Sequence, residues 1–216
     1  MPARYAPLFA GAAGVLDSHR GLDYGALEVA RAFGRRLSVE PFTATTTRLV
    51  VDLNRSSYHR NVFSEYTRVL GREERAAAMA AHYWPYRNAV EGAVDHAVAA
   101  GRSVLHVSSH SFTPVLHGEV RHCDIGFLYD PARPCEARFI DAWHEAVRVA
   151  APTLVLRRNY PYRGTSDALV TYLRRRHGER AYGGVELEVN QKHVGSRGWR
   201  SLVSMLTTTL ATAARV

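Results

Sequence analysis

Two segments of this chain have the composition of buried β-strands, yet they carry polar side chains at every second position. The segments span residues 104–112 and 185–190. Because side chains alternate along a strand, one face of each is polar. These faces carry His106, Ser108 and His110 in the first segment and Glu186, Glu188 and Asn190 in the second. Such groups are costly to bury unless they are paired, hydrogen-bonded or bound to metal, so the pattern predicts a functional site.

Length and composition favour one globular domain. The chain has 216 residues, of which 46% are hydrophobic and 22% are charged. This is enough to bury a full core, and we interpret residues 1–216 as a single domain. The two cysteines, Cys123 and Cys135, are too few for a disulfide framework or a cysteine-rich zinc site. We expect both to be reduced.

Predicted strands and helices alternate along the chain. Apolar spacing predicts helices at 26–37, 73–100, 136–149, 165–177 and 197–214, and strands at 45–53, 103–110, 153–158 and 185–190. Pro85 is expected to break the long second helix, and Thr165 or Ser166 to cap the fourth. Strands separated by helices predict an α/β fold, with a mostly parallel mixed sheet and helices on both faces.

Polar residues follow four of the predicted strands. In open α/β sheets, ligands bind at the carboxyl ends of the strands. The residues at these ends are Asn54 and Arg55, His110 and Ser111, Arg158 and Asn159, and Glu188 and Asn190. A single Asn or Arg after a strand commonly does no more than cap a loop. Their coincidence at four strands predicts a ligand site at this edge.

The net charge of +8 is not concentrated in one segment. Apart from Lys192 the basic residues are arginines spread along the chain, and the densest run, 174–177, lies where a helix is expected to end. We therefore do not expect a nucleic-acid partner. No apolar run approaches the roughly 20 residues of a membrane span, and residues 1–16 lack the pattern of a signal peptide. We expect a cytoplasmic protein without a membrane partner.

Five motifs resemble the N-formylglutamate amidohydrolase family in order and spacing. They are RLVVDLNR at 48–55, HVSSHSFTP at 106–114, Arg121 with DIG at 124–126, RNYPY at 158–162 and ELEVNQ at 186–191. More distantly, the motifs at 52–55 and 110–111 and Glu188 resemble the zinc carboxypeptidase-like fold. That resemblance implies a three-layer architecture of the phosphorylase/hydrolase type.

The resemblance also implies an activity and a cofactor. A member of this family would cleave the amide bond of an N-acyl amino acid such as N-formylglutamate, or of a related small amide. Zn²⁺ would supply a Lewis acid and make water more acidic. Asp23 and His110 would be metal ligands, Glu188 the general base, and Glu186 a neighbour that raises the pKa of Glu188.

The substrate contacts follow from the same comparison. Asn54 and Arg55 would bind a substrate carboxylate, the arginine through its planar fork of donors. The other residues expected to line the pocket are Arg121, Arg158, Asn159, Tyr162 and His19.

Each of these residues also has a structural interpretation. His110 could be a hydrogen-bonded core histidine, and the glutamates could lie on an exposed edge strand. Arg55 could form a salt bridge, with Asp52 as its partner. Asp23 could be a helix N-cap, and the sequence leaves surface pairing open for both Arg121 and Arg158.

One departure from the family pattern lies at the start of the chain. Relatives begin with a strand that ends in a His-Gly-Gly or His-Ala-Gly motif, whose histidine is expected to bind the metal. Met1-Pro2 falls about where the residues that follow that motif would lie. The sequence therefore predicts one missing zinc ligand, an exposed flank on the neighbouring strand, and weak zinc binding with little amidase activity.

Two other classes of function compete with this interpretation. A metal-free binding protein would use Arg55, Arg121 and Arg158 to hold a small anion and would show no hydrolysis. A nucleic-acid binder would need a contiguous basic surface, and its affinity would fall steeply with salt.

Overall fold

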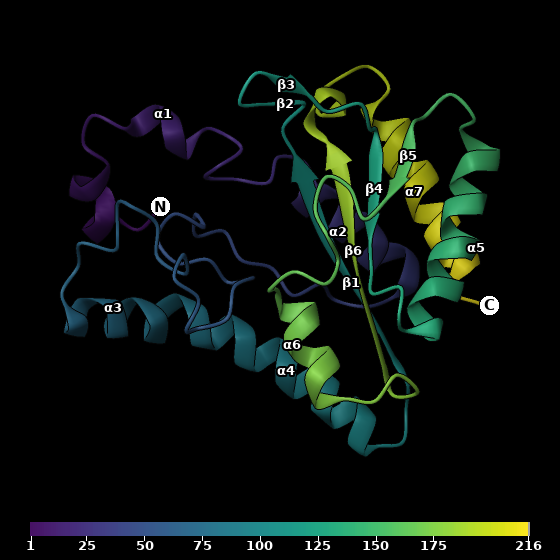
Figure 1. The fold of residues 1–216 in the computed structure, drawn as a ribbon, viewed down its shortest axis with the longest axis horizontal. Helices are drawn as coiled ribbons and strands as arrows, with labels where there is room; N and C mark the ends of the chain where they lie inside the picture. The colour runs from purple at the N-terminus through teal and green to yellow at the C-terminus, as the bar shows by residue number, and fades with distance from the viewer. Residues whose placement is uncertain (216) are drawn as a thin grey trace.

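The computed structural model describes residues 1–215, whose helices and strands are drawn in Figure 1. The helices are η1 (Ala3–Phe9), α1 (Ala13–Leu16), α2 (Ala26–Leu37), α3 (Arg72–Ala78), the π-helical turn η2 (Met79–Tyr83), α4 (Trp84–Ala99), α5 (Pro134–Ala150), α6 (Leu169–Arg176), η3 (Gln191–His193) and α7 (Trp199–Ala213). The strands are β1 (Val104–Phe112), β2 (Val115–Leu116), β3 (Glu119–Val120), β4 (Ile125–Leu128), β5 (Leu156–Arg158) and β6 (Tyr182–Asn190). No helix within residues 1–215 is long and apolar enough to cross a membrane.

Four strands form the central sheet in the order β1-β6-β4-β5. β1 is parallel to β6, and β4 is parallel to β5, whereas β4 and β6 are antiparallel. The prediction of a mostly parallel mixed sheet is confirmed. β1 lies at one edge of this sheet, and the small β2–β3 pair forms a separate sheet along the chain between β1 and β4.

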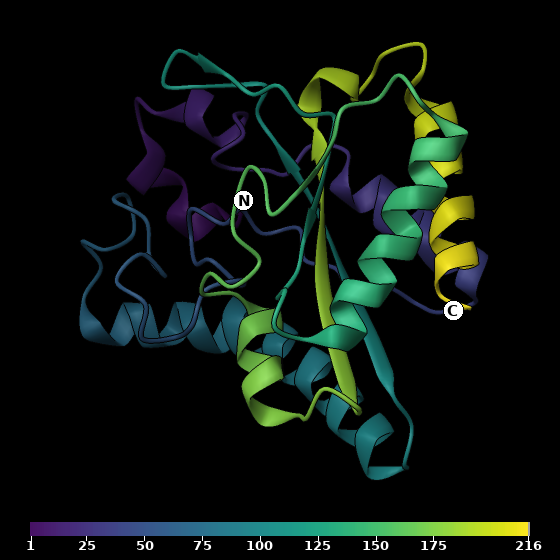
Figure 2. The same ribbon diagram turned by 45° about the vertical axis from the view of Figure 1, so that its right-hand side comes forward.

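Three helices cover one face of the sheet. Figures 1 and 2 show α5 and α7 side by side on this face, with α2 behind the strands. The main apolar core lies here, and it includes Val185, Leu187 and Val189 of β6 together with the fully buried Trp143 of α5. Because side chains alternate, the remaining residues of β6 point to the opposite face.

The opposite face is covered by α4 and α6. Val90 and Val94 of α4 pack with Leu169 and Leu173 of α6 and with Tyr182 of β6. With helices on both faces, the predicted three-layer α/β architecture is confirmed. This second face carries Glu186 and Glu188.

A buried ion pair joins α5, α6 and β6. Glu136 of α5 is fully buried, and its Oε1 accepts hydrogen bonds from Arg174 Nε at 2.9 Å and from the Gly184 backbone N–H at 3.0 Å. Arg174 also donates to the carbonyl oxygens of Gly164 and Gly184. These contacts satisfy a charge pair that would otherwise be costly inside the protein.

The predicted strand at 45–53 is wrong. Consecutive turns replace it, with Val50 N–H donating to Thr47 O at 3.0 Å and Asp52 N–H to Val62 O at 2.8 Å. Its apolar residues are nevertheless buried, in a separate cluster with Tyr5 and Tyr83 that belongs to residues 1–83. A short apolar run has the same pattern whether it is buried as a strand or as turns.

Two predicted helix boundaries also differ from the structure. The expected break at Pro85 takes the form of the π-helical turn η2, after which the helix continues as α4. The fourth helix begins at Leu169, so the predicted caps Thr165 and Ser166 are wrong. The Leu169 N–H instead donates to Asn54 Oδ1, at 2.9 Å, from a distant part of the chain.

The ion pair between Glu136 of α5 and Arg174 of α6 predicts that two arginines of α6 differ greatly in their contribution to stability. Arg174→Met removes the buried cation that donates to Glu136 and leaves Arg133, whose Nε lies 3.2 Å from the same carboxylate oxygen, so we expect the free energy of unfolding to fall by about 3 kcal/mol. Arg176→Met removes an exposed partner of Asp95 and should cost less than about 1 kcal/mol. Urea unfolding of both variants measures the difference, and equal losses would contradict the role given to Glu136.

Candidate active site

A cavity of about 240 Å³ opens at the carboxyl ends of β1 and β6. Its lining includes His19, Asp23, Arg48, Asp52, Asn54, Arg55, His110, Leu128, Tyr162, Arg163, Asp167, Glu186 and Glu188. A larger, mostly apolar cavity of about 560 Å³ lies beside β1 and shares Asp23, Arg48 and His110 with it. The polar cavity lies where the strand-end rule predicts a ligand site.

His110 and Asp23 meet at the centre of the polar cavity. His110 Nδ1 lies 2.7 Å from Asp23 Oδ2, and Arg48 donates to Asp23 Oδ1 at 3.1 Å. Asp23 precedes α2 but does not cap it, because the N-cap is Gly25. The His110 hydrogen bond and the Arg48 charge outweigh the burial of Asp23 and hold the pKa of its carboxyl below the ordinary value.

The imidazole of His110 lies between carboxylates. Its second nitrogen, Nε2, is 3.6 Å from Glu186 Oε1. Burial disfavours the charged ring, but the hydrogen bond and charge of Asp23 and the charges of Glu186 and Glu188 outweigh it and raise the pKa of His110 to about 9. A metal ion that binds His110 would have to compete with a proton for the ring nitrogen.

Glu188 is a buried carboxylate with a free oxygen. It lies opposite His110 in the β1–β6 register, only 6% of its surface is exposed, and its Oε2 has no hydrogen-bond partner among residues 1–215. Burial raises the pKa of Glu188 to about 8; the Asp23 and Glu186 charges add to this effect, and the His110 charge opposes it. A proton-exchanging group at a ligand cavity is expected to have such a perturbed pKa.

Among the described residues, Glu186, unlike Glu188, has a hydrogen-bond donor at its carboxylate. Its Oε1 accepts a hydrogen bond from Asn54 Nδ2 at 3.0 Å, in addition to facing His110. Both glutamates are buried in the second strand of the sheet, so the alternative of an exposed edge strand does not hold.

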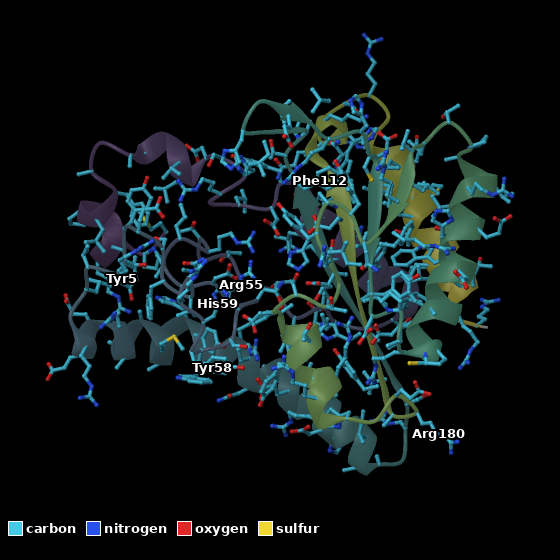
Figure 3. The ribbon with its side chains drawn as sticks, in the orientation of Figure 1. Tyr5, Arg55, Tyr58, His59, Phe112 and Arg180 are labelled. Atoms are coloured by element: carbon cyan, nitrogen blue, oxygen red, sulfur yellow. The ribbon has the colours of Figure 1, made fainter. Side chains whose placement is uncertain are left out.

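Arg55 lies in the cavity wall, and most of its donors have no partner in the described part of the chain. Its Nη1 donates to the Asp167 carbonyl oxygen at 2.8 Å, and the predicted Asp52 salt bridge is absent among residues 1–215. Asp52 instead pairs with Arg48 at 3.4 Å. Figure 3 labels Arg55 on the side of the strands that faces the N-terminal segment.

Arg121 and Tyr162 lie together at the edge of the cavity. Arg121 Nη1 donates to the Tyr162 hydroxyl at 3.2 Å, and its guanidinium lies over the rings of Phe112 and Tyr162. Only the tyrosine and the phenylalanine reach the cavity lining. Arg121 therefore contacts two lining residues without being one of them.

Two of the predicted pocket residues are turned away. Arg158 pairs with Asp141 of α5 at 2.7 Å, on the surface. Asn159 accepts hydrogen bonds from the Tyr129 and Gly164 backbone N–H groups. Neither belongs to the lining.

Arg48, Arg163 and Asp167 are among the lining residues that sequence reasoning missed. Arg48 lies within the first motif, and its position four residues before Asp52 could have indicated a charge pair. Asp167 and Arg163 follow the RNYPY motif in a loop, and no periodicity marks them. Asp167 accepts from the Ser56 backbone N–H at 2.9 Å and so connects this loop to the turn after Asn54.

Comparison with known proteins agrees with this geometry. The sequence model of the family described as N-formylglutamate amidohydrolase matches residues 1–194. The chain belongs to the N-formylglutamate amidohydrolase family. A search of curated proteins found no match.

Two solved structures are similar to the chain. The crystal structure of gene product Atu2144 from Agrobacterium tumefaciens shares 29% identity with a TM-score of 0.81, covering 100% of this chain and 86% of the other. That of N-formylglutamate amidohydrolase from Ralstonia eutropha JMP134 shares 19% identity with a TM-score of 0.71, covering 100% and 89%. At 19% identity, the similarity to the second structure shows that the two proteins share a fold and does not extend to function.

The donor atoms of the site are of types that bind zinc, but they are fewer than a catalytic zinc site usually has. Imidazole nitrogen and carboxylate oxygen are common zinc ligands, and those of His110 and Asp23 point at one another. Within residues 1–215, however, no group of three or more His, Cys, Asp or Glu side chains converges on one point. Catalytic zinc usually takes three protein ligands, so these two residues by themselves supply an incomplete set.

Proposed function

We propose that the protein hydrolyses the amide bond of an N-acyl amino acid of the N-formylglutamate type, with Zn²⁺ held by His110 and Asp23. The observation that carries the proposal is Glu188, a buried carboxylate with an unpartnered oxygen beside these two groups. Family membership supports hydrolysis as the reaction. The cytoplasmic location stays a prediction.

Zinc would supply a Lewis acid for the amide carbonyl and would make a nearby water more acidic. Glu188 takes a proton from the attacking water and delivers it to the leaving nitrogen. A group that titrates near neutrality can accept and return a proton, and the positive charge of a metal ion beside Glu188 would favour the ionised carboxylate that the first step needs. Arg48 keeps Asp23 ionised and in place.

Arg55 binds the substrate carboxylate. Within residues 1–215 only one of its donors is used, which leaves part of the guanidinium fork for an anion in the cavity. Tyr162 and Phe112 form the wall, and Arg121 fixes the tyrosine hydroxyl. A cavity of about 240 Å³ suits a small amide and not a protein substrate.

A specific observation keeps a second candidate open. The described residues offer two convergent metal ligands and no third, which favours a metal-free homologue that binds a small anion at Arg55. Such a protein would bind N-formylglutamate in calorimetry but would release no formate, with or without added zinc.

Glu188→Gln tests the proposed base. The variant should lose kcat by at least ~10²-fold while the KM stays within about twofold, because the carboxylate acts on water and not on ground-state binding. Formate release from N-formylglutamate with added zinc measures both constants. Glu145→Gln, an exposed change of the same chemistry, is the control. Full turnover in the Glu188 variant would exclude this residue as the base.

Arg55→Lys tests the carboxylate contact. Charge is conserved, but an ammonium cannot form two parallel hydrogen bonds, so we expect the KM to rise by about tenfold with kcat little changed. Arg158→Lys, on a residue outside the cavity, is the matched control. An unchanged KM in a folded variant would move Arg55 to a structural role.

His110→Ala tests the metal ligand without a measurement of activity. We expect zinc affinity, measured by competition with a chromophoric chelator, to fall at least about tenfold, because one of two donors is lost. His193→Ala removes a histidine that pairs with Asp124 instead. Equal affinities in the two variants would contradict zinc binding at His110.

A further inference from the structure

The side-chain amide of Asn54 is engaged by the protein at both ends. Its Nδ2 donates to Glu186 Oε1 at 3.0 Å, and its Oδ1 accepts from the Leu169 N–H at 2.9 Å. An asparagine amide has two N–H hydrogens and one oxygen. The oxygen and one hydrogen are therefore committed to β6 and to the first residue of α6. This leaves one hydrogen for any ligand.

The contact with Glu186 acts on a second residue. The Glu186 side chain is only 7% exposed, and its Oε1 is the atom that lies 3.6 Å from His110 Nε2. A buried carboxylate needs a hydrogen-bond donor to stay in one orientation. Asn54 supplies that donor to the same oxygen.

Glu186 and Asp23 lie at the two nitrogens of the His110 ring, and Asp23 forms a hydrogen bond with it. One carboxylate faces Nε2 and the other faces Nδ1, at 3.6 and 2.7 Å. Histidine ligands of metals commonly have a carboxylate on the nitrogen opposite the metal, and this partner fixes the ring and its tautomer. Glu186 has the position of such a partner.

We propose that Asn54 acts as a positioning residue: it fixes Glu186 beside His110, so that Nδ1 of the ring stays directed at Asp23. This inference rests on the proposed function, because it concerns the same site. Through Leu169 the same side chain holds the start of α6 against the turn that carries Arg55. Asn54 thus connects the α6 end of the cavity wall to the acid–base groups.

Two single variants and their combination test the contact of Asn54 with Glu186 separately from its contact with Leu169. Asn54→Asp keeps an oxygen for the Leu169 N–H at the start of α6, where a negative charge is favourable, but it replaces the donor to Glu186 with a second carboxylate. Glu186→Gln removes the charge. In the double variant the donor and acceptor exchange places, because the introduced glutamine amide can donate to the introduced aspartate carboxylate.

The kinetic constants distinguish positioning from substrate binding. We expect Asn54→Asp to lower kcat by about tenfold or more with the KM within about twofold. The double variant should exceed the kcat predicted from the product of the two single losses by about tenfold, because the contact is restored. A substrate ligand would instead raise the KM in both proteins that carry Asn54→Asp, by repulsion of the substrate carboxylate. That result, or additive losses, would overturn the proposal.

A measurement on the metal-free protein keeps the inference separate from the activity. The ¹⁵N shifts of the two His110 ring nitrogens report their protonation and hydrogen bonding. Asn54→Asp should change the Nε2 signal, the double variant should return it toward the wild-type value, and the exposed change Asn61→Asp should leave it unaltered. If the wild-type protein shows no hydrolysis but these shifts occur, the proposed reaction fails and the positioning role stands. Unchanged shifts in Asn54→Asp would overturn the role itself.

Discussion

The parallel pairing of β1 with β6 is the constraint on which the site depends. In its register His110 lies beside Glu188, and Ser108 lies beside Glu186. A shift of one residue would place these polar side chains against the apolar helices α2, α5 and α7. The register is held because Val185 and Leu187 fill that core from the other face of β6. The packing of one face therefore aligns the chemistry of the other.

Charged groups that line the cavity below the surface must be compensated, and the turns after α2 supply much of the compensation. Arg48 pairs with Asp23 and Asp52, and Asn54 donates to Glu186. Arg48 and Asp52 lie in the segment that was predicted to be a strand, and Asn54 follows it directly. A strand there would alternate their directions, whereas consecutive turns gather several polar side chains on one side. Glu188 Oε2 is left without such a partner among residues 1–215.

The sequence predicted the elements that depend on local periodicity and missed those that depend on distant contacts. The helices α2, α5 and α7 and the alternating faces of β1 and β6 follow from repeats of 3.6 or 2 residues. The directions of the Arg158 and Asn159 side chains do not follow from such a repeat, because a residue at the end of a strand can turn to either side of the sheet. Arg158 turned to α5 and Asn159 to the backbone. The start of α6 was missed since its capping oxygen belongs to Asn54, 115 residues away.

The same limit explains why a family motif does not settle the role of each residue within it. Asn54 and Arg55 are adjacent in the motif at 48–55, and the resemblance assigns both to a substrate carboxylate. In the fold they face different partners: Arg55 contacts a backbone oxygen and keeps free donors, whereas Asn54 contacts Glu186 and α6. Each contact inside the protein uses up one donor hydrogen or one lone pair, so the contacts of each side chain, and not its place in the motif, decide how much of it is left for a ligand.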